Sequence, residues 1–341
     1  MNLSPSAADA LGGRLPPEDA LLSGREFVDD VLAPLAACDD LAGRIKLRHA
    51  VVAVGRSGLT RGDFAGHPIR AERPFRLLVE TPQGEESMDA DAVIDASGVY
   101  SLPAAIGAGG IPAPGERALA GRMIRHLGTL HERLDTLRGR RILLVGHGHS
   151  AANAVVNLSA LAAQTPGTRV IWATRSMNRR PCVEVASDPL PERHRIVFEA
   201  NRLAAQPPSW LQVERRARIE CIRQARDGSV RVAVSGDRII SADEIIGLTG
   251  YRPDWSFLTE LAIEVAPDTE GSARLARALS NVTDCLSVPS LAPADLDSGE
   301  AGFYLAGAKS YGRARTFLLQ SGYAQLETIL DGIQRRDFAA A

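Results

Sequence analysis

The 341-residue sequence predicts an α/β protein of two related three-layer units, each combining a parallel sheet with a meander of short strands. Three observations support this class. An apolar run at 142–145 leads directly into a glycine-rich turn and a helical pattern, and two long segments repeat one order of short strands. The composition, 45% hydrophobic and 23% charged, is that of a globular chain with a large core. At about 150 residues per domain, the length suits two units.

The apolar run Ile142–Val145 has the composition of a parallel strand that is buried on both faces. The next residues, 146–151, read G-H-G-H-S-A and fit the pattern G-x-G-x-x-A. Apolar residues then continue at helical spacing as far as Leu161. Strand, glycine turn and helix in this order are typical of a Rossmann-type dinucleotide site, and the alternative is a glycine turn with a purely structural role.

Each small residue of the turn has a physical task in such a site. Gly146 allows the tight turn, Gly148 lets the backbone approach a pyrophosphate, and Ala151 permits close packing of the helix on the strand. The phosphates would then lie against the N–H groups and the positive dipole end of the helix, at His149 and Ser150. We therefore predict that this turn binds a dinucleotide.

The end of the following strand indicates which dinucleotide is bound. The run Thr168–Ala173 is rich in β-branched and aromatic residues, and an NAD site would usually place an Asp or Glu at its end. This sequence has Arg175 there instead, with Arg179 and Arg180 close behind. Because Arg matches a phosphate with two parallel hydrogen bonds, we expect NADPH, with Arg175 near its 2′-phosphate. The alternative is that these arginines are solvated surface residues.

Two segments of the chain, 43–103 and 211–254, repeat the same order of elements. Each contains short strands, including a three-stranded meander, and then an acid-containing lead into a buried run. The buried runs stop at a small residue followed by glycine, Ser97-Gly98 in the first segment and Thr249-Gly250 in the second. Similarity on this scale predicts two homologous units.

Only the second unit shows the strand, glycine turn and helix in front of its meander. The residues before Gly43 do not resemble that pattern and contain instead a predicted helix over 24–37, with a capping box at Ser23 and Glu26. We therefore expect the first unit to be truncated at its N-terminus. An alternative is that Met1 is an internal methionine of a longer chain. Loss of central strands would leave an unpaired sheet edge, so we expect a partner chain or a homo-oligomer to cover it.

Charge and hydropathy narrow the classes of partner and location. Lys plus Arg number 39 against 41 Asp plus Glu, and no basic tract stands out, so we expect no nucleic-acid partner. The apolar runs are far shorter than the ~20 residues of a membrane span, and the N-terminus lacks a signal-peptide pattern. We therefore expect a soluble cytoplasmic protein that acts on a small molecule.

Cysteine spacing argues against two kinds of centre. Cys38, Cys182, Cys221 and Cys285 lie far apart and form no C-x-x-C pair or zinc-ligand spacing. We therefore expect neither a dithiol redox centre nor a metal site, and we interpret the thiols as buried or incidental.

The phrases VIDASG, GHSAANA, TGYRPD and GAKSYGRA-TFLL-SGY occur together in this chain. With this combination, over nearly all of residues 1–335, the sequence resembles the two-dinucleotide-binding-domain flavoproteins, the superfamily of flavin monooxygenases and pyridine nucleotide oxidoreductases. The resemblance implies two Rossmann-like units, in which an NAD(P)-binding domain, 119–284, is inserted into an N-terminally truncated FAD domain, 1–118 and 285–341. It also implies FAD and NADPH as cofactors.

The resemblance assigns further residues to cofactor binding. It implies that the glycines of Ser97-Gly98 and Thr249-Gly250, where the domains join, allow the backbone to approach a cofactor closely. It also implies that a strand ends at Gly307 and that the following loop reaches the flavin through Lys309 and Ser310. The alternative is a basic surface loop.

By the same resemblance, a helix that begins at Thr316 would direct its N-terminus at the pyrimidine edge of the isoalloxazine ring. Negative charge develops at that edge on reduction, and a helix N-terminus or Lys309 would stabilise it. One departure concerns the monooxygenase fingerprint F-x-G-x-x-x-H, which the stretch from His126 to His131 does not match. No catalytic acid or base is predicted.

The expected activity is that of an FAD-dependent oxidoreductase. NADPH would reduce the flavin, which would then reduce oxygen or a small organic substrate, as in a monooxygenase. The alternative is a truncated or degenerate relative that binds NADPH without a flavin of its own, and is either non-catalytic or dependent on a partner chain.

Overall fold

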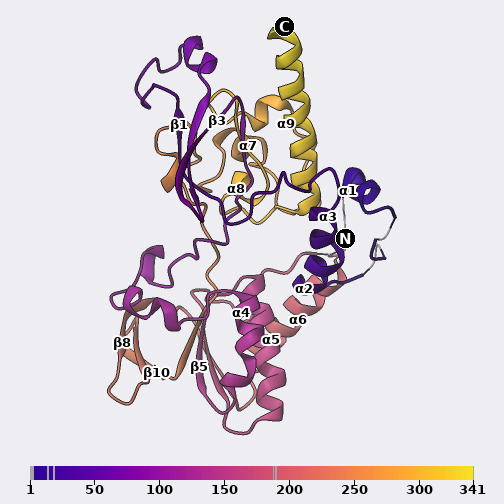
Figure 1. Cartoon of the computed structure of the whole chain (residues 1–341). Helices are drawn as coiled ribbons and strands as arrows, with labels where there is room; N and C mark the ends of the chain where they lie inside the picture. The colour runs from indigo at the N-terminus through magenta and orange to yellow at the C-terminus, as the bar shows by residue number, and fades with distance from the viewer. Residues whose placement is uncertain (1–3, 14, 18–19, 187, 189, 341) are drawn as a thin grey trace. The chain divides into compact units, whose positions relative to one another are not determined.

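The computed structural model describes residues 4–13, 15–17, 20–186, 188 and 190–340. It consists of two compact units (Figure 1). Unit 1 comprises Met1–Leu102 and Arg252–Ala341, and unit 2 comprises Pro103–Tyr251. Unit 2 is thus inserted into the sequence of unit 1, and the domain bounds 119–284 stay a prediction.

Packing accounts for both ends of this inserted unit. At its start, the backbone N–H of Ala104 donates to the Gly250 carbonyl at 2.9 Å, and the Ile106 side chain is buried in the core of unit 2. These contacts place the residues after 102 in unit 2. At its end, Leu258 and Leu275 are buried in two cores of unit 1, so the chain has already returned to that unit.

The parallel sheet of unit 2 has the strand order β11-β5-β6-β7. Its strands and helices are β5 (Arg141–Val145), α5 (His149–Gln164), β6 (Arg169–Ala173), α6 (Pro191–Ala205), β7 (Leu211–Glu214) and β11 (Glu244–Gly247). The predicted β-α-β crossover is confirmed, since β5 and β6 pair in parallel and α5 connects them. Helix α6 lies in a stretch for which the sequence patterns predicted no element.

A meander completes unit 2. It consists of β8 (Ile219–Gln224), β9 (Val230–Val234) and β10 (Arg238–Ala242), which pair antiparallel in the order β10-β9-β8. A short helix, α4 (Leu127–Arg133), precedes the parallel sheet in the sequence. In Figure 1, α4, α5 and α6 lie on one side of β5, and β8 and β10 lie on the other. Unit 2 therefore has the predicted three layers.

Strand β5 joins the two cores of unit 2, because successive side chains of a strand point to opposite faces. Ile142 and Leu144 are buried with residues of α5 and α6. Leu143 and Val145 are buried with residues of the meander. Ala151 is fully buried, which lets α5 approach the sheet closely.

Unit 1 repeats the meander but has a shorter parallel sheet. Its strands and helices after the N-terminal segment are β1 (Ala50–Arg56), β2 (Phe75–Thr81), β3 (Gly84–Ala90), β4 (Val93–Asp95), α7 (Ala273–Ala278), β12 (Phe303–Leu305), α8 (Ala308–Tyr311) and α9 (Leu319–Ala340). β1, β2 and β3 pair antiparallel, and β4 pairs in parallel with β12. The two sequence parts of this unit therefore share a sheet, as predicted. Among the described residues of unit 1, β4 has no strand other than β12 beside it.

The N-terminal segment is helical, as predicted, although it is divided. It contains α1 (Pro5–Ala10), α2 (Gly24–Phe27), a π-helical turn (Val28–Leu32) and α3 (Ala33–Ala36). The predicted capping box is confirmed: the Ser23 hydroxyl accepts from the Glu26 N–H at 3.2 Å, and the Glu26 carboxylate accepts from the Ser23 N–H at 2.7 Å. None of the described helices combines the length and the apolar character that a bilayer span requires.

Candidate nucleotide sites in the two units

The glycine turn of unit 2 follows β5 and is shaped by its neighbours. Gly146 has a φ of 129°, and a Cβ atom there would overlap the backbone oxygen of Leu248, just after β11. The Gly146 carbonyl accepts a hydrogen bond from Trp172 Nε1 at 2.7 Å. Glycine is therefore required at this position by the packing of three neighbouring strands, before any ligand is considered.

Gly148 has a different role, because it lies in open space. A Cβ atom there would have no other atom within 4 Å. Gly148 is the N-cap of α5 and provides no side-chain acceptor for the first N–H groups of that 16-residue helix. Ser150 is half-buried in the first turn, and Ala151 is fully buried behind it. The open, uncapped end of a long helix can hold an anion without displacing any protein group.

Arg175 lies at the carboxyl end of β6 and is exposed. Within the described part of the chain it has no ion-pair partner, unlike Arg180, whose guanidinium lies 3.5 Å from the Glu184 carboxylate. Arg179 donates to the Ala205 carbonyl at 3.3 Å. Of the three arginines predicted near the strand end, Arg175 is thus the one whose guanidinium has neither an ion pair nor a hydrogen bond within the described residues, so it can turn toward a phosphate without breaking a contact.

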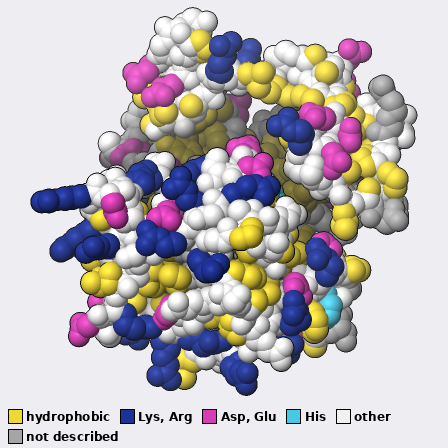
Figure 2. Space-filling view, turned by 90° about the horizontal axis from the view of Figure 1, so that it is seen from below, with side chains coloured by type: hydrophobic (Ala, Val, Ile, Leu, Met, Phe, Trp, Pro, Cys, Tyr) yellow, Lys and Arg dark blue, Asp and Glu magenta, His cyan; other side chains and the backbone are white. Residues whose placement is uncertain are grey.

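Several arginines of unit 2 are held in ion pairs. Figure 2 shows Lys and Arg side chains spread over one face of the molecule, between acidic and apolar side chains. Arg141 lies 2.6 Å from Asp243, and Arg202 lies 2.7 Å from Glu199. Arg175 has no such partner among the described residues, a property that it shares with other exposed arginines of unit 2 such as Arg223 and Arg231, and its position at the carboxyl end of β6 distinguishes it from them.

Thr249 and Gly250 follow β11 at the same carboxyl edge of the sheet. The Thr249 hydroxyl donates to the Ala104 carbonyl at 2.7 Å, and Gly250 has a φ of 95° with open space around it. Since the carboxyl ends of parallel strands meet at one edge, the residues predicted from β5, β6 and β11 are brought together there.

Two aromatic residues at this edge were not predicted as site residues. The His126 and Tyr251 rings are stacked, with centroids 5.4 Å apart and planes at 21°, and the Tyr251 hydroxyl lies 3.2 Å from His126 Nδ1. Tyr251 stands in the phrase TGYRPD, which was the available signal. His126 precedes α4 in the sequence, and only the folded chain brings it to Tyr251.

In unit 1, the predicted residues gather after β4 and β12. Lys309 is fully buried, and its Nζ lies 2.6 Å from an Asp95 carboxylate oxygen and donates to the Ser97 hydroxyl at 3.4 Å. The ammonium also lies 4.2 Å and 5.1 Å from the ring centroids of Phe257 and Trp255. Burial lowers the pKa of Lys309, and the Asp95 carboxylate opposes that effect. The alternative of a basic surface loop does not describe Lys309, whose charge is balanced inside the unit.

The glycines of unit 1 adopt conformations that favour glycine. Gly98 has a φ of 74° in open space, and Gly307 has a φ of 66°. The Gly307 N–H donates to Gln325 Oε1 at 2.9 Å, and the Ser310 hydroxyl donates to the Gly307 carbonyl at 2.8 Å. Thr316 is buried but precedes α9, which begins at Leu319 and hence later than predicted.

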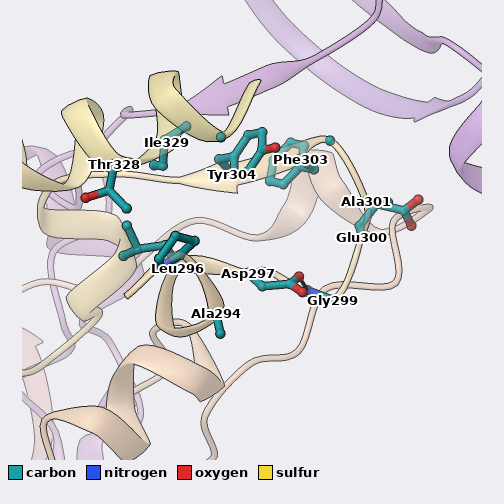
Figure 3. A pocket seen from close by; sticks show the side chains of 13 residues that line it. Ala294, Leu296, Asp297, Gly299, Glu300, Ala301, Phe303, Tyr304, Thr328 and Ile329 are labelled. Carbon is teal, nitrogen blue, oxygen red and sulfur yellow. Dashed lines mark hydrogen bonds between the residues drawn. The ribbon is translucent and has the colours of Figure 1, made fainter. Parts of the chain in front are cut away.

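A cavity of about 370 Å³ lies elsewhere in unit 1, between β12, α9 and a 3₁₀ turn at Pro293–Leu296 (Figure 3). Its lining includes Tyr304, Ile329 and two carboxylates, none of them a predicted site residue. Asp297 lies 2.7 Å from Arg274, and Glu300 is bound to Arg56 and Arg70. The acidic groups of the cavity are therefore already neutralised.

Cys38, Cys182, Cys221 and Cys285 form no disulfide in the described structure. Cys182 is buried, and burial raises the pKa of its thiol to about 12, with a smaller effect of Glu184 in the same direction. A thiol with this pKa carries almost no thiolate at neutral pH and is a poor nucleophile.

Comparisons with known proteins agree with this architecture. No protein-family model and no curated protein matches the sequence. Among solved structures, the bacillithiol disulfide reductase Bdr from Bacillus cereus has a TM-score of 0.62 at 17% identity, over 95% of this chain and 84% of that one. The ornithine N-hydroxylase KtzI from Kutzneria sp. 744 has a TM-score of 0.58 at 17% identity, over 94% and 79% of the two chains.

A third similar structure is DfoA, a cadaverine monooxygenase from Erwinia amylovora solved with FAD. Its TM-score is 0.56 at 13% identity, over 92% of this chain and 73% of that one. These similarities span both units and extend to reductases and hydroxylases alike. At such low identity they establish the fold, and the chain therefore has the two-dinucleotide-binding-domain flavoprotein fold that its motifs predict.

Proposed function

We propose that the chain is an FAD-dependent oxidoreductase that takes its electrons from NADPH bound to unit 2. The observation that carries the proposal is the glycine turn between β5 and α5. There, Gly148 leaves open space at an uncapped helix N-terminus, at the carboxyl edge of a parallel sheet. This is the arrangement that binds a pyrophosphate in dinucleotide-binding folds.

The choice of NADPH rests on Arg175. It is exposed at the end of β6, and no carboxylate holds it in the described structure. In a dinucleotide whose pyrophosphate lies on α5, the adenosine half extends toward β6, where Arg175 can bind a 2′-phosphate with two hydrogen bonds. Gly146, Ala151 and Thr249 would shape the turn without contributing charge.

The residues of unit 1 fit the isoalloxazine ring of FAD better than they fit its pyrophosphate. Ser97, Gly98 and Gly307 provide backbone that a flat ring can approach closely, at the carboxyl ends of β4 and β12. The described residues of unit 1 contain no counterpart of the β5–glycine turn–α5 arrangement that could hold a pyrophosphate. When bound, FAD supplies the chemistry of accepting a hydride and passing electrons to an acceptor.

Oxygen or a small organic molecule is the acceptor that the chain's own residues favour. The cysteines lack the C-x-x-C spacing of a dithiol centre and form no disulfide in the described structure, and burial keeps the Cys182 thiol protonated. We therefore propose a monooxygenase-like or small-molecule reductase activity. In this proposal the reduced flavin does not pass its electrons to a disulfide of the chain itself.

A second candidate function follows from the incomplete sheet of unit 1. In the described structure, β4 pairs with β12 alone. A chain with this edge could bind NADPH in unit 2 but hold no flavin of its own, or bind flavin only together with a partner chain or a second copy.

The visible absorption spectrum of purified full-length protein separates the two candidates. The oxidoreductase is expected to be yellow or to become yellow with added FAD, and anaerobic NADPH should bleach that colour. Protein that stays colourless with FAD while still binding NADPH would support the second candidate. Protein that binds neither FAD nor NADPH would contradict both.

A further inference from the structure

The strand order of unit 2 determines where each half of a bound dinucleotide would lie. Strand β5, which leads into the glycine turn, has β6 on one side and β11 on the other. With the pyrophosphate on α5 and the adenosine half toward β6, the nicotinamide half extends toward β11. Residues at the carboxyl end of β11 and beyond it are therefore candidates for contact with the nicotinamide.

Tyr251 and His126 occupy that position. Tyr251 comes just after the carboxyl end of β11, and His126 comes just after Ile124, which forms a parallel bridge to Ile246 of β11. Both side chains are partly exposed. Two segments of backbone thus present neighbouring aromatic rings at the same edge of the sheet as the glycine turn.

The two rings hold each other in place. They are stacked with centroids 5.4 Å apart, and the Tyr251 hydroxyl lies within hydrogen-bond distance of both His126 Nδ1, at 3.2 Å, and the Arg125 carbonyl, at 3.3 Å. Pre-organised aromatic surfaces of this kind bind flat rings with little loss of side-chain entropy. Arg125 is itself fixed by Glu116 at 3.1 Å, so the backbone under the pair is anchored.

We propose that Tyr251 forms the wall against which the nicotinamide ring of NADPH rests, and that His126 is a positioning residue that orients Tyr251. The inference rests on the proposed binding of NADPH to unit 2. It goes further by assigning a subsite for the half of the cofactor that the glycine turn and Arg175 do not contact.

Binding of two ligands to the full-length protein tests the inference, and it needs no flavin. The ligands are NADPH and 2′,5′-ADP, which carries the adenosine half without the nicotinamide. Titration calorimetry should show that Tyr251→Leu weakens NADPH binding about tenfold and leaves 2′,5′-ADP binding within about twofold. Tyr251→Phe, which keeps the ring, should recover most of the lost NADPH affinity.

His126→Phe keeps a ring beside Tyr251 but removes the hydrogen bond, so it should weaken NADPH binding about threefold. The matched control is His131→Ala, because His131 is also hydrogen-bonded, to Asn157 at 2.7 Å. This control should leave both affinities unchanged. If Tyr251→Leu fails to fold, the comparison of Tyr251→Phe and His126→Phe with wild type decides in its place.

The possible results are distinguishable. Selective loss of NADPH affinity in Tyr251→Leu supports the inference. Loss of both ligands, or of neither, overturns it and leaves the NADPH site in place. Wild-type protein that binds 2′,5′-ADP as tightly as NADPH also overturns the nicotinamide subsite. Wild-type protein that binds neither ligand overturns the proposed NADPH function together with the inference.

Discussion

The two units share a plan but differ in what lies beside one strand. In unit 2, the short strand after the meander, β11, pairs with β5, and β5 leads into the glycine turn. In unit 1, the corresponding strand, β4, pairs within the described residues only with β12. Both units therefore contain the meander, while the glycine turn between a parallel strand and a long helix is found, among the described residues, in unit 2 alone.

The ends of these two strands also carry different chemistry. Beyond β11, Thr249 and Gly250 form an uncharged backbone surface close to the open glycine turn. At the end of β4, Asp95 is buried with Lys309, so a cation and an anion cancel there. This contrast teaches that the two strand ends suit different ligands: the end of β11 lies beside an open helix N-terminus, whereas the charges at the end of β4 are balanced within the unit and leave uncharged backbone at Gly98 open.

The largest effect is expected in the buried charge cluster of unit 1. Glu300 is 2% exposed and binds Arg56 at 2.8 Å and Arg70 at 3.1 Å. Glu300→Gln would leave two buried guanidinium groups without a counter-charge, which should cost about 3–5 kcal/mol of unfolding free energy. Urea unfolding measures this change, and NADPH binding by unit 2 should persist in the folded protein.

In the wild-type protein, protonation of the Glu300 carboxylate at low pH should destabilise the fold as the Glu300→Gln substitution does, because it removes the same negative charge. Burial opposes its ionisation, but the Ala262 N–H and the two arginines outweigh burial and lower its pKa. A lowered folded-state pKa stabilises the protein above the unfolded-state value, and this contribution is lost as pH falls through the folded one. The control is Asp89→Asn, which breaks an exposed pair with Arg76 and should barely change stability. An equal effect of the two substitutions would contradict the assignment.

Two glycine substitutions in unit 2 separate the structural role of the turn from its role in binding. Gly146→Ala would push a methyl group into the Leu248 carbonyl, so it should destabilise the protein by about 2 kcal/mol or more. Gly148→Ala meets no protein atom and should fold normally, but its methyl group would occupy the place of the pyrophosphate and abolish NADPH binding. Thermal melts and calorimetry measure the two effects. Normal NADPH binding by Gly148→Ala would contradict the site.

The smallest expected effect concerns the choice between NADPH and NADH. Arg175→Ala should weaken NADPH binding about tenfold and leave NADH binding unchanged, because a charge-assisted hydrogen bond to the 2′-phosphate is lost. Arg179→Ala is the matched control, since Arg179 donates to the Ala205 carbonyl. If both variants changed NADPH affinity equally, the effect would be one of general surface charge.

The sequence was sufficient for elements whose pattern is local. The strand, turn and helix at 141–164 follow from apolar periodicity and glycine spacing, and the meanders follow from short β-branched runs between turn residues. Helix α6 was not predicted. Helix α9 begins later than expected, because helix boundaries depend on packing that a single sequence does not reveal.

The contacts that distinguish the two strand ends could not be predicted from local patterns. Asp95 and Lys309 are far apart in the sequence, as are His126 and Tyr251, and each pair meets only when two strand ends reach one sheet edge. The resemblance implied that Lys309 reaches the flavin, which stays a prediction, and no local pattern indicated that its ammonium is buried beside the Asp95 carboxylate. The start of unit 2 also depends on distant contacts, since Ile106 joins a core formed by strands far along the sequence.

A crystal structure of the full-length protein with NADPH tests the central claim most directly. The account predicts the pyrophosphate against the Gly146–Ala151 turn, the 2′-phosphate at Arg175 and the nicotinamide beside Tyr251. A dinucleotide bound elsewhere, or the reverse orientation with adenosine toward β11, would contradict it.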